Sequence, residues 1–210
     1  MFHAVDLDEV RMMRTVGPSM FKDRALQFVT RHEWPLKLRP DGLEVDQFDD
    51  DRTTYCIVEE RGRHLASVRL RPARAGSMVE SCFPELWRDS ASRLRDGHEV
   101  TRFCTTPGLS AERRLEVVSD LLLGLCRHCR ATGVDSFFGI VFPAVARSLR
   151  QTGWPARVLD QSRDPSGTLL LAQWAATELV AWDIQERREF REALMRDRKL
   201  PVTEVEQLVA

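Results

Sequence analysis

The feature that most constrains the fold is a long amphipathic segment followed closely by an almost unbroken apolar run. Residues Glu112–Ala131 carry apolar side chains at helical spacing and stop just before Gly133, which predicts a helix. Residues Ser136–Phe142 then form the kind of apolar run that is typical of a central strand covered on both faces. The sequence therefore predicts an α/β fold, a three-layer α-β-α sandwich around a single mixed sheet.

Shorter patterns on either side of this pair predict the remaining elements. Strands are expected at Phe2–Val5, Tyr55–Val58, Leu65–Leu70, Glu99–Cys104, Ala156–Leu159 and Thr168–Trp174. Helices are expected over Leu7–Val16, from a cap at Ser19 to about His32, within Phe83–Leu94, over Pro143–Thr152 and over Asp183–Arg198. Gly17-Pro18 should interrupt the first two helices, and the polar stretch Pro35–Thr53 should be a loop of the length that is often functional.

Length and composition narrow the class of protein. A chain of 210 residues fits one domain, which we expect over residues 1–182, with a charged C-terminal helix or extension over 183–210. With 31 basic and 32 acidic residues, the chain lacks the positive charge of a dedicated nucleic-acid binder. No run approaches the roughly 20 apolar residues of a membrane span. These observations predict no nucleic-acid partner and no membrane partner.

The cysteines point to a reducing compartment. Five is an odd number, and a chain of this size needs no disulfides for stability. The N-terminal residues contain three acidic side chains and no apolar core of a signal peptide, so a cytoplasmic location is expected. Cys126-x-x-Cys129 lies inside the apolar helical run without a second cysteine pair, and is interpreted as two packing thiols rather than a metal site.

Common catalytic motifs are missing from the sequence. There is no G-x-G-x-x-G, Walker A, G-x-S-x-G or H-E-x-x-H pattern, and the five histidines are scattered. Charged residues do occur where partly buried strands are predicted, namely Arg69, Glu99 and Arg102, and Asp46 and Asp49 lie three apart in the polar loop. Buried charges must be paired. Spacing alone leaves two interpretations open: a structural ion-pair network, or a pocket for a ligand that carries both signs of charge.

An ordered set of charged and aromatic residues runs from Arg24 to Phe103. It comprises Arg24-x-x-x-Phe28 and Trp34, Glu44-Val45-Asp46-Gln47-Phe48-Asp49, Ser67-Val68-Arg69-Leu70, and Glu99-Val100-Thr101-Arg102-Phe103. It continues more loosely through Gly139-Ile140-Val141 and Thr152-Gly153-Trp154. In this order and spacing the set resembles the acyl-homoserine-lactone synthases, also called autoinducer synthases.

The resemblance implies both a fold and a reaction. The fold would be a single α/β domain similar to N-acetyltransferases. The enzyme would be an acyltransferase that acylates the amine of S-adenosylmethionine from an acyl thioester, closes the lactone and releases methylthioadenosine, for bacterial quorum sensing. S-adenosylmethionine would be a substrate, so no cofactor and no metal are implied. The acyl donor would be acyl-carrier protein or acyl-coenzyme A.

The resemblance also implies a site. The residues assigned to S-adenosylmethionine are Arg24, Phe28, Trp34, Asp46, Asp49, Arg69 and Arg102. The two aromatic rings can face the adenine or the sulfonium, a cation–π contact of ~0.5–2 kcal/mol, although Phe28 can equally be a core residue. The aspartates can offset positive charge, and the arginines can hold the substrate carboxylate or fix the aspartates. The predicted catalytic residues are Glu99, as general base through a water, and Arg102.

The spacing of Glu99 and Arg102 gives a geometric expectation. Residues three apart in a regular strand point to opposite faces of the sheet. If both side chains reach one pocket, a β-bulge must lie between them. Backbone N–H groups at such an irregularity are also the expected donors to the oxyanion that forms during acyl transfer.

An apolar tunnel is expected for the acyl group. Its candidate residues, each of which can also be plain core, are Thr101, Phe103, Leu122, Phe138, Gly139, Phe142, Leu149 and Trp154. At position 139, family members that make 3-oxo products usually have threonine. Gly139 has no side-chain donor, so we expect an acyl group without a 3-oxo substituent, although Thr101 can still donate. The four phenylalanines between Phe103 and Phe142 would suit a branched or aryl acyl group on coenzyme A.

An acidic carrier protein would need a basic docking patch. Arg147 and Arg150 on the predicted helix Pro143–Thr152 are candidates, with Arg113 and Arg114, and all four can also be ordinary solvated arginines. Two rival functions stay open. One is an acyl-coenzyme A-dependent N-acyltransferase of another small amine, although residues 105–110 lack the Gly-rich signature of that family. The other is a non-catalytic binding module.

Overall fold

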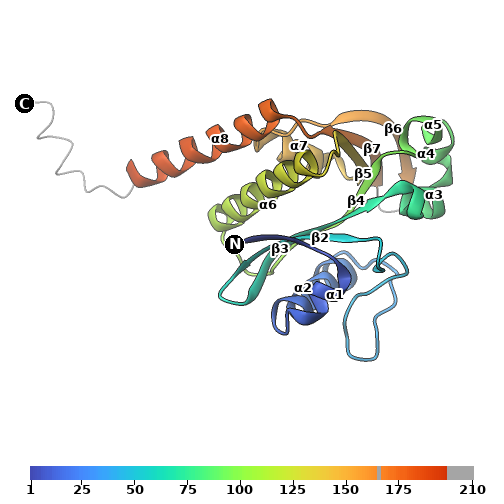
Figure 1. The fold of residues 1–210 in the computed structure, drawn as a ribbon, viewed down its shortest axis with the longest axis horizontal. Helices are drawn as coiled ribbons and strands as arrows, with labels where there is room; N and C mark the ends of the chain where they lie inside the picture. The colour runs from blue at the N-terminus through green and yellow to red at the C-terminus, as the bar shows by residue number, and fades with distance from the viewer. Residues whose placement is uncertain (165–166, 198–210) are drawn as a thin grey trace, which may run out of the picture.

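The computed structural model describes residues 1–164 and 167–197. Within these residues, seven strands form one sheet in the order β1-β2-β3-β4-β5-β7-β6 (Figure 1). The strands are β1 (Phe2–Val5), β2 (Thr54–Glu60), β3 (Arg63–Pro72), β4 (His98–Thr105), β5 (Ser136–Val141), β6 (Arg157–Asp164) and β7 (Gly167–Ala175). β4 and β5 pair in parallel and all other neighbours are antiparallel, so the predicted single mixed sheet is confirmed.

Helices lie on both faces of the sheet, which confirms the three layers (Figure 1). One face carries α1 (Leu7–Met12), α2 (Val16–Arg24) and the π-helix η1 (Ala25–Arg31). The other carries α6 (Ala111–Ala131), α7 (Pro143–Gln151) and α8 (Glu178–Asp197). A 3₁₀ turn (Ala73–Ala75) and the short helices α3 (Met78–Cys82), α4 (Pro84–Arg88) and α5 (Ala91–Leu94) connect β3 to β4.

The long helix α6 forms where the sequence predicts it. The Ser110 side chain accepts a hydrogen bond from the backbone N–H of Arg113 (3.1 Å), which caps the first turn. Gly133 follows the helix with a φ of +74°, the left-handed conformation that ends helices. The apolar side of α6 is buried against the sheet, and Cys126 and Cys129 are buried in the same core as free thiols. The two cysteines therefore pack the helix, as expected.

Strand β3 presents apolar side chains to one face of the sheet and charged side chains to the other. Ala66, Val68 and Leu70 point into the core beneath α6. Arg69 and Arg71, which alternate with them, point to the face that carries α1 and α2, because successive side chains in a strand point to opposite sides. All five side chains are buried. One strand thus supplies apolar side chains to the core and guanidinium groups to the opposite layer.

The N-terminal helices differ from the sequence prediction. The expected helix Leu7–Val16 ends at Met12, and α2 begins at Val16. Gly17-Pro18 does not interrupt the helices but lies in the first turn of α2, where the missing N–H of proline removes no helical hydrogen bond. Ser19 is not the cap either, since its hydroxyl donates to the carbonyl of Val16 (2.9 Å) inside that turn.

Two later helical regions also differ from the sequence prediction. The last helix begins at Glu178, five residues before Asp183, and its predicted end at Arg198 lies outside the described residues, as do residues 199–210. Phe83–Leu94 contains α4 and α5 rather than one short helix. Within residues 1–164 and 167–197, no helix combines the length and apolar character needed to cross a membrane.

Candidate active site

Strand β4 contains the predicted bulge. Thr101 pairs with Arg69 and Cys104 pairs with Ser67, so two residues of β4, Arg102 and Phe103, lie opposite one residue of β3. Arg102 has a φ of +56°, a left-handed conformation that is uncommon outside glycine. The extra residue shifts the alternation, so Arg102 lies on the same face as Thr101 and Glu99. The geometric expectation for this pair is therefore confirmed.

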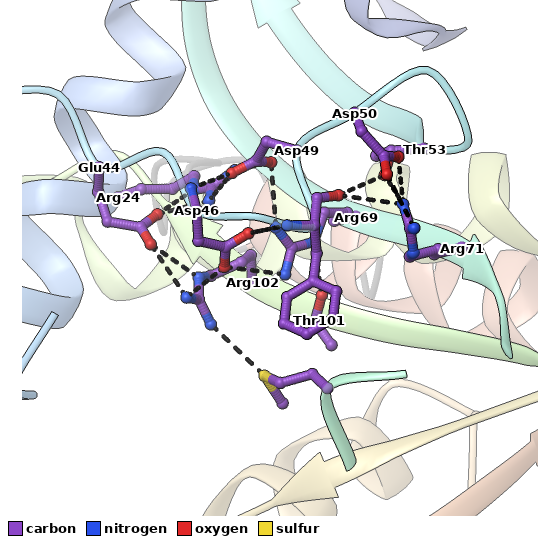
Figure 2. Close-up of polar contacts among 12 residues, drawn as sticks. Arg24, Glu44, Asp46, Asp49, Asp50, Thr53, Arg69, Arg71, Thr101 and Arg102 are labelled. Atoms are coloured by element: carbon purple, nitrogen blue, oxygen red, sulfur yellow. Dashed lines mark hydrogen bonds and ion pairs between the residues drawn. The ribbon is translucent and has the colours of Figure 1, made fainter. Parts of the chain in front are cut away.

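Six side chains meet on this face and form what we call the arginine–carboxylate cluster (Figure 2). Its members are Arg24, Arg69 and Arg102 with Glu44, Asp46 and Asp49. They come from α2, the loop before β2, β3 and β4. The sequence predicts five of the six members as site residues, and the structure brings these five together.

Arg24 is held from two sides. Its Nη1 and Nη2 donate to the two oxygens of Asp49 (2.9 and 2.8 Å), and its Nε donates to Glu44 (2.5 Å). Asp49 also accepts from the Tyr55 hydroxyl (2.9 Å) and from the backbone N–H of Asp46 (2.9 Å). Paired, bidentate geometry of this kind satisfies a buried guanidinium. Arg24 and Glu44 are each 1% exposed.

Arg69 and Arg102 share Asp46. Arg69 donates to both Asp46 oxygens (2.5 and 3.1 Å) and to the Thr101 hydroxyl (2.9 Å). Arg102 donates to Asp46 (2.6 Å) and to Glu44 (3.1 Å). Glu44 therefore bridges Arg24 and Arg102, and Asp46 bridges Arg69 and Arg102. The cluster is one connected network with three positive and three negative groups.

The charges set the ionisation of the cluster. Burial acts to raise the pKa of Asp49, but the Arg24 and Arg69 guanidinium groups outweigh it and hold the pKa well below its usual value. Burial acts to lower the pKa of Arg24, and the Asp49 and Glu44 carboxylates reverse this and raise it. The pKa of Tyr55 is raised by burial and by Asp49. Arg24, Arg69 and Asp49 are therefore charged near neutral pH.

Glu44 was missed as a site residue. It lies in the quoted Glu44–Asp49 motif, but the sequence interpretation gave roles only to the two aspartates of that motif. Charge balance alone would not have found it, because three carboxylates, those of Asp46, Asp49 and Glu99, were already set against the three arginines. A second pair was also missed, in which Arg71 donates to both oxygens of Asp50 (Figure 2).

Aromatic rings border the cluster. Phe28 and Trp34 are stacked, with centroids 5.0 Å apart and planes 14° apart. The Arg102 guanidinium lies 5.5 Å from the Phe28 centroid. Phe28 is buried and Trp34 is half-buried. The ring pair thus connects the cluster to the molecular surface, and Phe28 combines core packing with a cation–π contact.

Glu99 lies next to the cluster but makes no ion pair with its members. One carboxylate oxygen accepts from the Ser77 hydroxyl (3.0 Å) and from the Val79 N–H (2.8 Å), and the other accepts from the Met78 N–H (2.8 Å). Met78 connects the two, since its sulfur is 3.7 Å from Nη1 of Arg102. Burial raises the pKa of Glu99 despite these hydrogen bonds, which act in the opposite direction.

The predicted acyl residues fall into separate environments. Leu122, Leu149 and Trp154 belong to the core under α6, and Phe103 packs against it. Phe138 belongs to a different apolar cluster, with Trp87 of α4. Thr101 faces the arginine–carboxylate cluster, and Phe142 precedes α7 as its N-cap residue.

Gly139 is required by the packing of two strands. A Cβ at this position would lie 2.4 Å from the carbonyl oxygen of Val100 on β4. β4 and β5 pair only at His98 and Glu99 in the described residues, so Gly139 lies just beyond the point where their pairing ends. A residue with a side chain here would push the strands apart.

The arginines proposed for carrier docking lie on two helices. Arg113, at the start of α6, is paired with Glu60 (2.8 Å) and Glu116 (3.0 Å), and Arg114 follows it. Arg147 and Arg150 are exposed on α7. In the part of the chain that the structure describes, no group of three or more histidine, cysteine or acidic side chains is arranged to hold a metal ion.

Known proteins are similar to this chain in sequence and in fold. The family model of the autoinducer synthases matches residues 8–178. The chain belongs to the autoinducer synthase family. The acyl-homoserine-lactone synthase of Rhizobium etli is 28% identical over 185 residues, which cover 84% of this chain and 85% of that protein. The expected activity, synthesis of acyl-homoserine lactones by an acyltransferase, is thereby confirmed.

Solved structures show the same fold. The coenzyme A-dependent acyl-homoserine lactone synthase MesI has a TM-score of 0.78 at 22% identity, covering 90% of this chain and 95% of that one. BjaI, solved with S-adenosylmethionine and isopentyl-coenzyme A, has a TM-score of 0.77 at 22% identity, covering 90% and 89%. An acyl-coenzyme A N-acyltransferase from Pseudomonas aeruginosa has a TM-score of 0.58 at 13% identity, covering 83% and 99%. The expected similarity of this autoinducer synthase to N-acyltransferases is confirmed at the level of fold.

Proposed function

We propose that this autoinducer synthase binds S-adenosylmethionine at the edge of the arginine–carboxylate cluster and uses Glu99 as the base for acyl transfer. The observation that carries the proposal is the cluster itself: six paired charges, five of them buried and that of Asp46 half-buried, beside a stacked aromatic pair. S-adenosylmethionine presents an ammonium, a carboxylate and a sulfonium. A site with both signs of charge and an aromatic surface matches all three groups.

Asp46 and Arg102 form the outer edge of the cluster. Their side chains are 13% and 6% exposed, and those of the other four members are at most 1% exposed. Asp46 is therefore the carboxylate best placed to receive the ammonium. Nη1 of Arg102 donates to the Met78 thioether, which is a weak acceptor, so a substrate carboxylate would be a better partner for it.

Trp34 provides the surface for the adenine or the sulfonium. It is half-buried and stacked on Phe28, so one ring face is supported from below. A sulfonium over such a ring gains a cation–π attraction of ~0.5–2 kcal/mol. Arg24, Arg69 and Asp49 lie behind this edge, where they hold the positions of Asp46 and Arg102.

Acyl transfer needs the substrate amine as a free base. Glu99 takes the proton through a water as the amine attacks the thioester carbonyl, and the thiol of the carrier leaves. The Glu99 oxygen that accepts only from Met78 N–H keeps a lone pair for that water. A carboxylate with a raised pKa is a stronger base. The irregular backbone at Arg102–Phe103 offers an N–H group to the oxyanion.

Lactone closure follows from the same binding mode. The substrate carboxylate attacks the carbon that bears the sulfonium, and methylthioadenosine leaves as a neutral thioether. The sulfonium is already a good leaving group, so the enzyme contributes by holding the chain folded. Arg102 has to release the carboxylate for this step, and its position at the cluster edge allows that.

The acyl donor is a thioester of coenzyme A or of acyl-carrier protein, and the reaction takes place in the cytoplasm. For the acyl group, Gly139 leaves no side-chain donor beside Val100, and we expect products without a 3-oxo substituent. Mass spectrometry of lactones from an expressing host, with and without added branched or aryl acids, tests this. Dominant 3-oxo products would contradict it.

The reaction itself is tested with purified protein, S-adenosylmethionine and an acyl thioester. We expect release of methylthioadenosine together with an acyl-homoserine lactone. An N-acyltransferase acting on another amine would consume the thioester without releasing methylthioadenosine. A binding module would consume neither substrate, so this single assay separates all three functions.

A further inference from the structure

After Glu99, one edge of β4 has no neighbouring strand in the part of the chain that the structure describes. Thr106 N–H donates to Leu65 of β3 (2.8 Å), so by alternation the backbone groups of Phe103 and Thr105 point away from β3. On that side β4 pairs with β5 only at His98 and Glu99 among the described residues. The carbonyl of Phe103 and the N–H of Thr105 therefore need another partner.

Gln27 supplies that partner. Its Nε2 donates to the Phe103 carbonyl (2.9 Å), and its Oε1 accepts from the Thr105 N–H (3.1 Å). One side-chain amide thus satisfies a donor and an acceptor two residues apart, as the backbone of an adjacent strand would. The two contacts are made at Phe103 and Thr105, just after Arg102, the residue with the φ of +56°. The two hydrogen bonds hold the backbone next to Arg102 in place. The left-handed conformation of Arg102 costs free energy, and these contacts help to maintain it.

Gln27 lies in the π-helix, beside Phe28. The carbonyl of Gln27 accepts from the N–H of His32 (3.1 Å), five residues later, which is the hydrogen bond that defines a π-helix. Phe28 contacts the Arg102 guanidinium at 5.5 Å, while Gln27 binds the backbone just after Arg102. Consecutive residues of η1 therefore hold the guanidinium and the backbone next to it.

We propose that Gln27 is a positioning residue, whose amide holds the β4 bulge so that Arg102 meets the carboxylate of S-adenosylmethionine. The proposal rests on the function proposed above. Gln27 touches no reacting atom and acts through Arg102. Its loss lowers the affinity for S-adenosylmethionine.

The first test replaces the amide with an apolar side chain of similar length. Gln27→Met removes both hydrogen bonds, and we expect the Kd for S-adenosylmethionine to rise about tenfold by calorimetry. The matched control is Gln173→Met, which removes the half-buried hydrogen bond to Ser136 (3.1 Å) between β7 and β5. The two variants should lose similar thermal stability, and only the first should lose affinity. Equal affinities in both variants would overturn the proposal.

The second test uses protonation to restore the two hydrogen bonds that Gln27 makes with Phe103 and Thr105, which we call the Gln27 clamp. In Gln27→Glu the carboxylate can accept from Thr105 N–H but repels the Phe103 carbonyl, whereas the protonated acid can donate to that carbonyl. The ratio of the variant Kd to the wild-type Kd should therefore fall toward one between pH 8 and pH 5. A flat ratio contradicts the clamp. This arm also decides the question if the methionine variant does not fold.

A third measurement tests the hydrogen bonds of Gln27 independently of the proposed function. In wild-type protein the Thr105 amide should be protected from hydrogen exchange, and in Gln27→Met it should exchange at least tenfold faster. This readout needs no substrate. A wild-type protein that fails to bind S-adenosylmethionine contradicts the proposed function, whereas unchanged exchange at Thr105 contradicts the clamp.

Discussion

The two faces of the same sheet solve the problem of burial in opposite ways. Beneath α6, β3 contributes Val68 and Leu70 to an apolar core. Such a core tolerates substitution by other apolar side chains of similar volume. On the opposite face, Arg69 is equally buried but depends on individual partners at hydrogen-bond distance. The apolar face holds the fold together, and the charged face fixes the geometry of a site.

The largest expected difference comes from removing one charge from the cluster. Arg24→Met leaves Glu44 and Asp49 buried without their shared partner, which should cost about 3–5 kcal/mol of unfolding free energy and abolish turnover. Leu121→Ala, on the apolar face, should cost about 2–5 kcal/mol but leave the turnover of the folded protein nearly unchanged. Urea unfolding and methylthioadenosine release measure the two effects. Normal turnover in Arg24→Met would remove the functional distinction between the faces.

The next largest effect is expected at Glu99. Glu99→Gln should lower turnover by about 10²–10⁴-fold, because the amide cannot take the proton from the amine. Ser77→Ala is the matched control, since it deletes one hydrogen bond to Glu99 and keeps the carboxylate. Initial rates of methylthioadenosine release compare the two variants. If Ser77→Ala loses as much turnover as Glu99→Gln, the role of Glu99 is to hold α3 and not to act as a base.

A smaller effect is expected from acid. The pKa of Asp49 is lowered in the folded protein, so its stabilising contribution is complete above the unfolded value of about 3.9 and is lost as pH falls below it. The free energy of unfolding should therefore drop between pH 5 and pH 2.5. In Asp49→Asn this drop should be shallower, as measured by urea unfolding at several pH values. An identical slope in both proteins would show that Asp49 is not responsible.

The smallest effect is expected on the outer surface. Replacing both Arg147 and Arg150 of α7 by glutamate should slow acylation from acyl-carrier protein several-fold at low salt, because steering of an acidic partner is lost. Acylation from acyl-coenzyme A should change less, and added salt should remove the difference. Rates with both donors measure the effect. Equal rates for wild type and variant with acyl-carrier protein would exclude these two arginines from docking.

The sequence predicts the apolar layer better than the charged one. Helix α6 is predicted within one residue of its start, because its apolar spacing and the stop at Gly133 agree. The bulge at Arg102 was expected because two site residues had to share a face. In both cases, local pattern and tertiary requirement point the same way.

Local pattern fails where long-range contacts decide. No local pattern in residues 25–31 predicts a π-helix. The contacts that Gln27 of this helix makes with β4 are long-range, with sequence separations of 76 and 78 residues, so they cannot be read from a local pattern. Gly17-Pro18 is a general sign of a helix break, yet it is compatible with a first helical turn. Glu44 was overlooked because its partners, Arg24 and Arg102, are distant in the chain.

The equal number of positive and negative groups in the cluster has a consequence for the end of the catalytic cycle. In the proposed binding mode, S-adenosylmethionine exchanges partners with Asp46 and Arg102, so the resting ion pair between these two residues competes with the substrate. The finished lactone amide is uncharged and has nothing to exchange. In the proposed binding mode, Asp46 and Arg102 would pair with each other again once the lactone forms, and this re-pairing would favour release of the product.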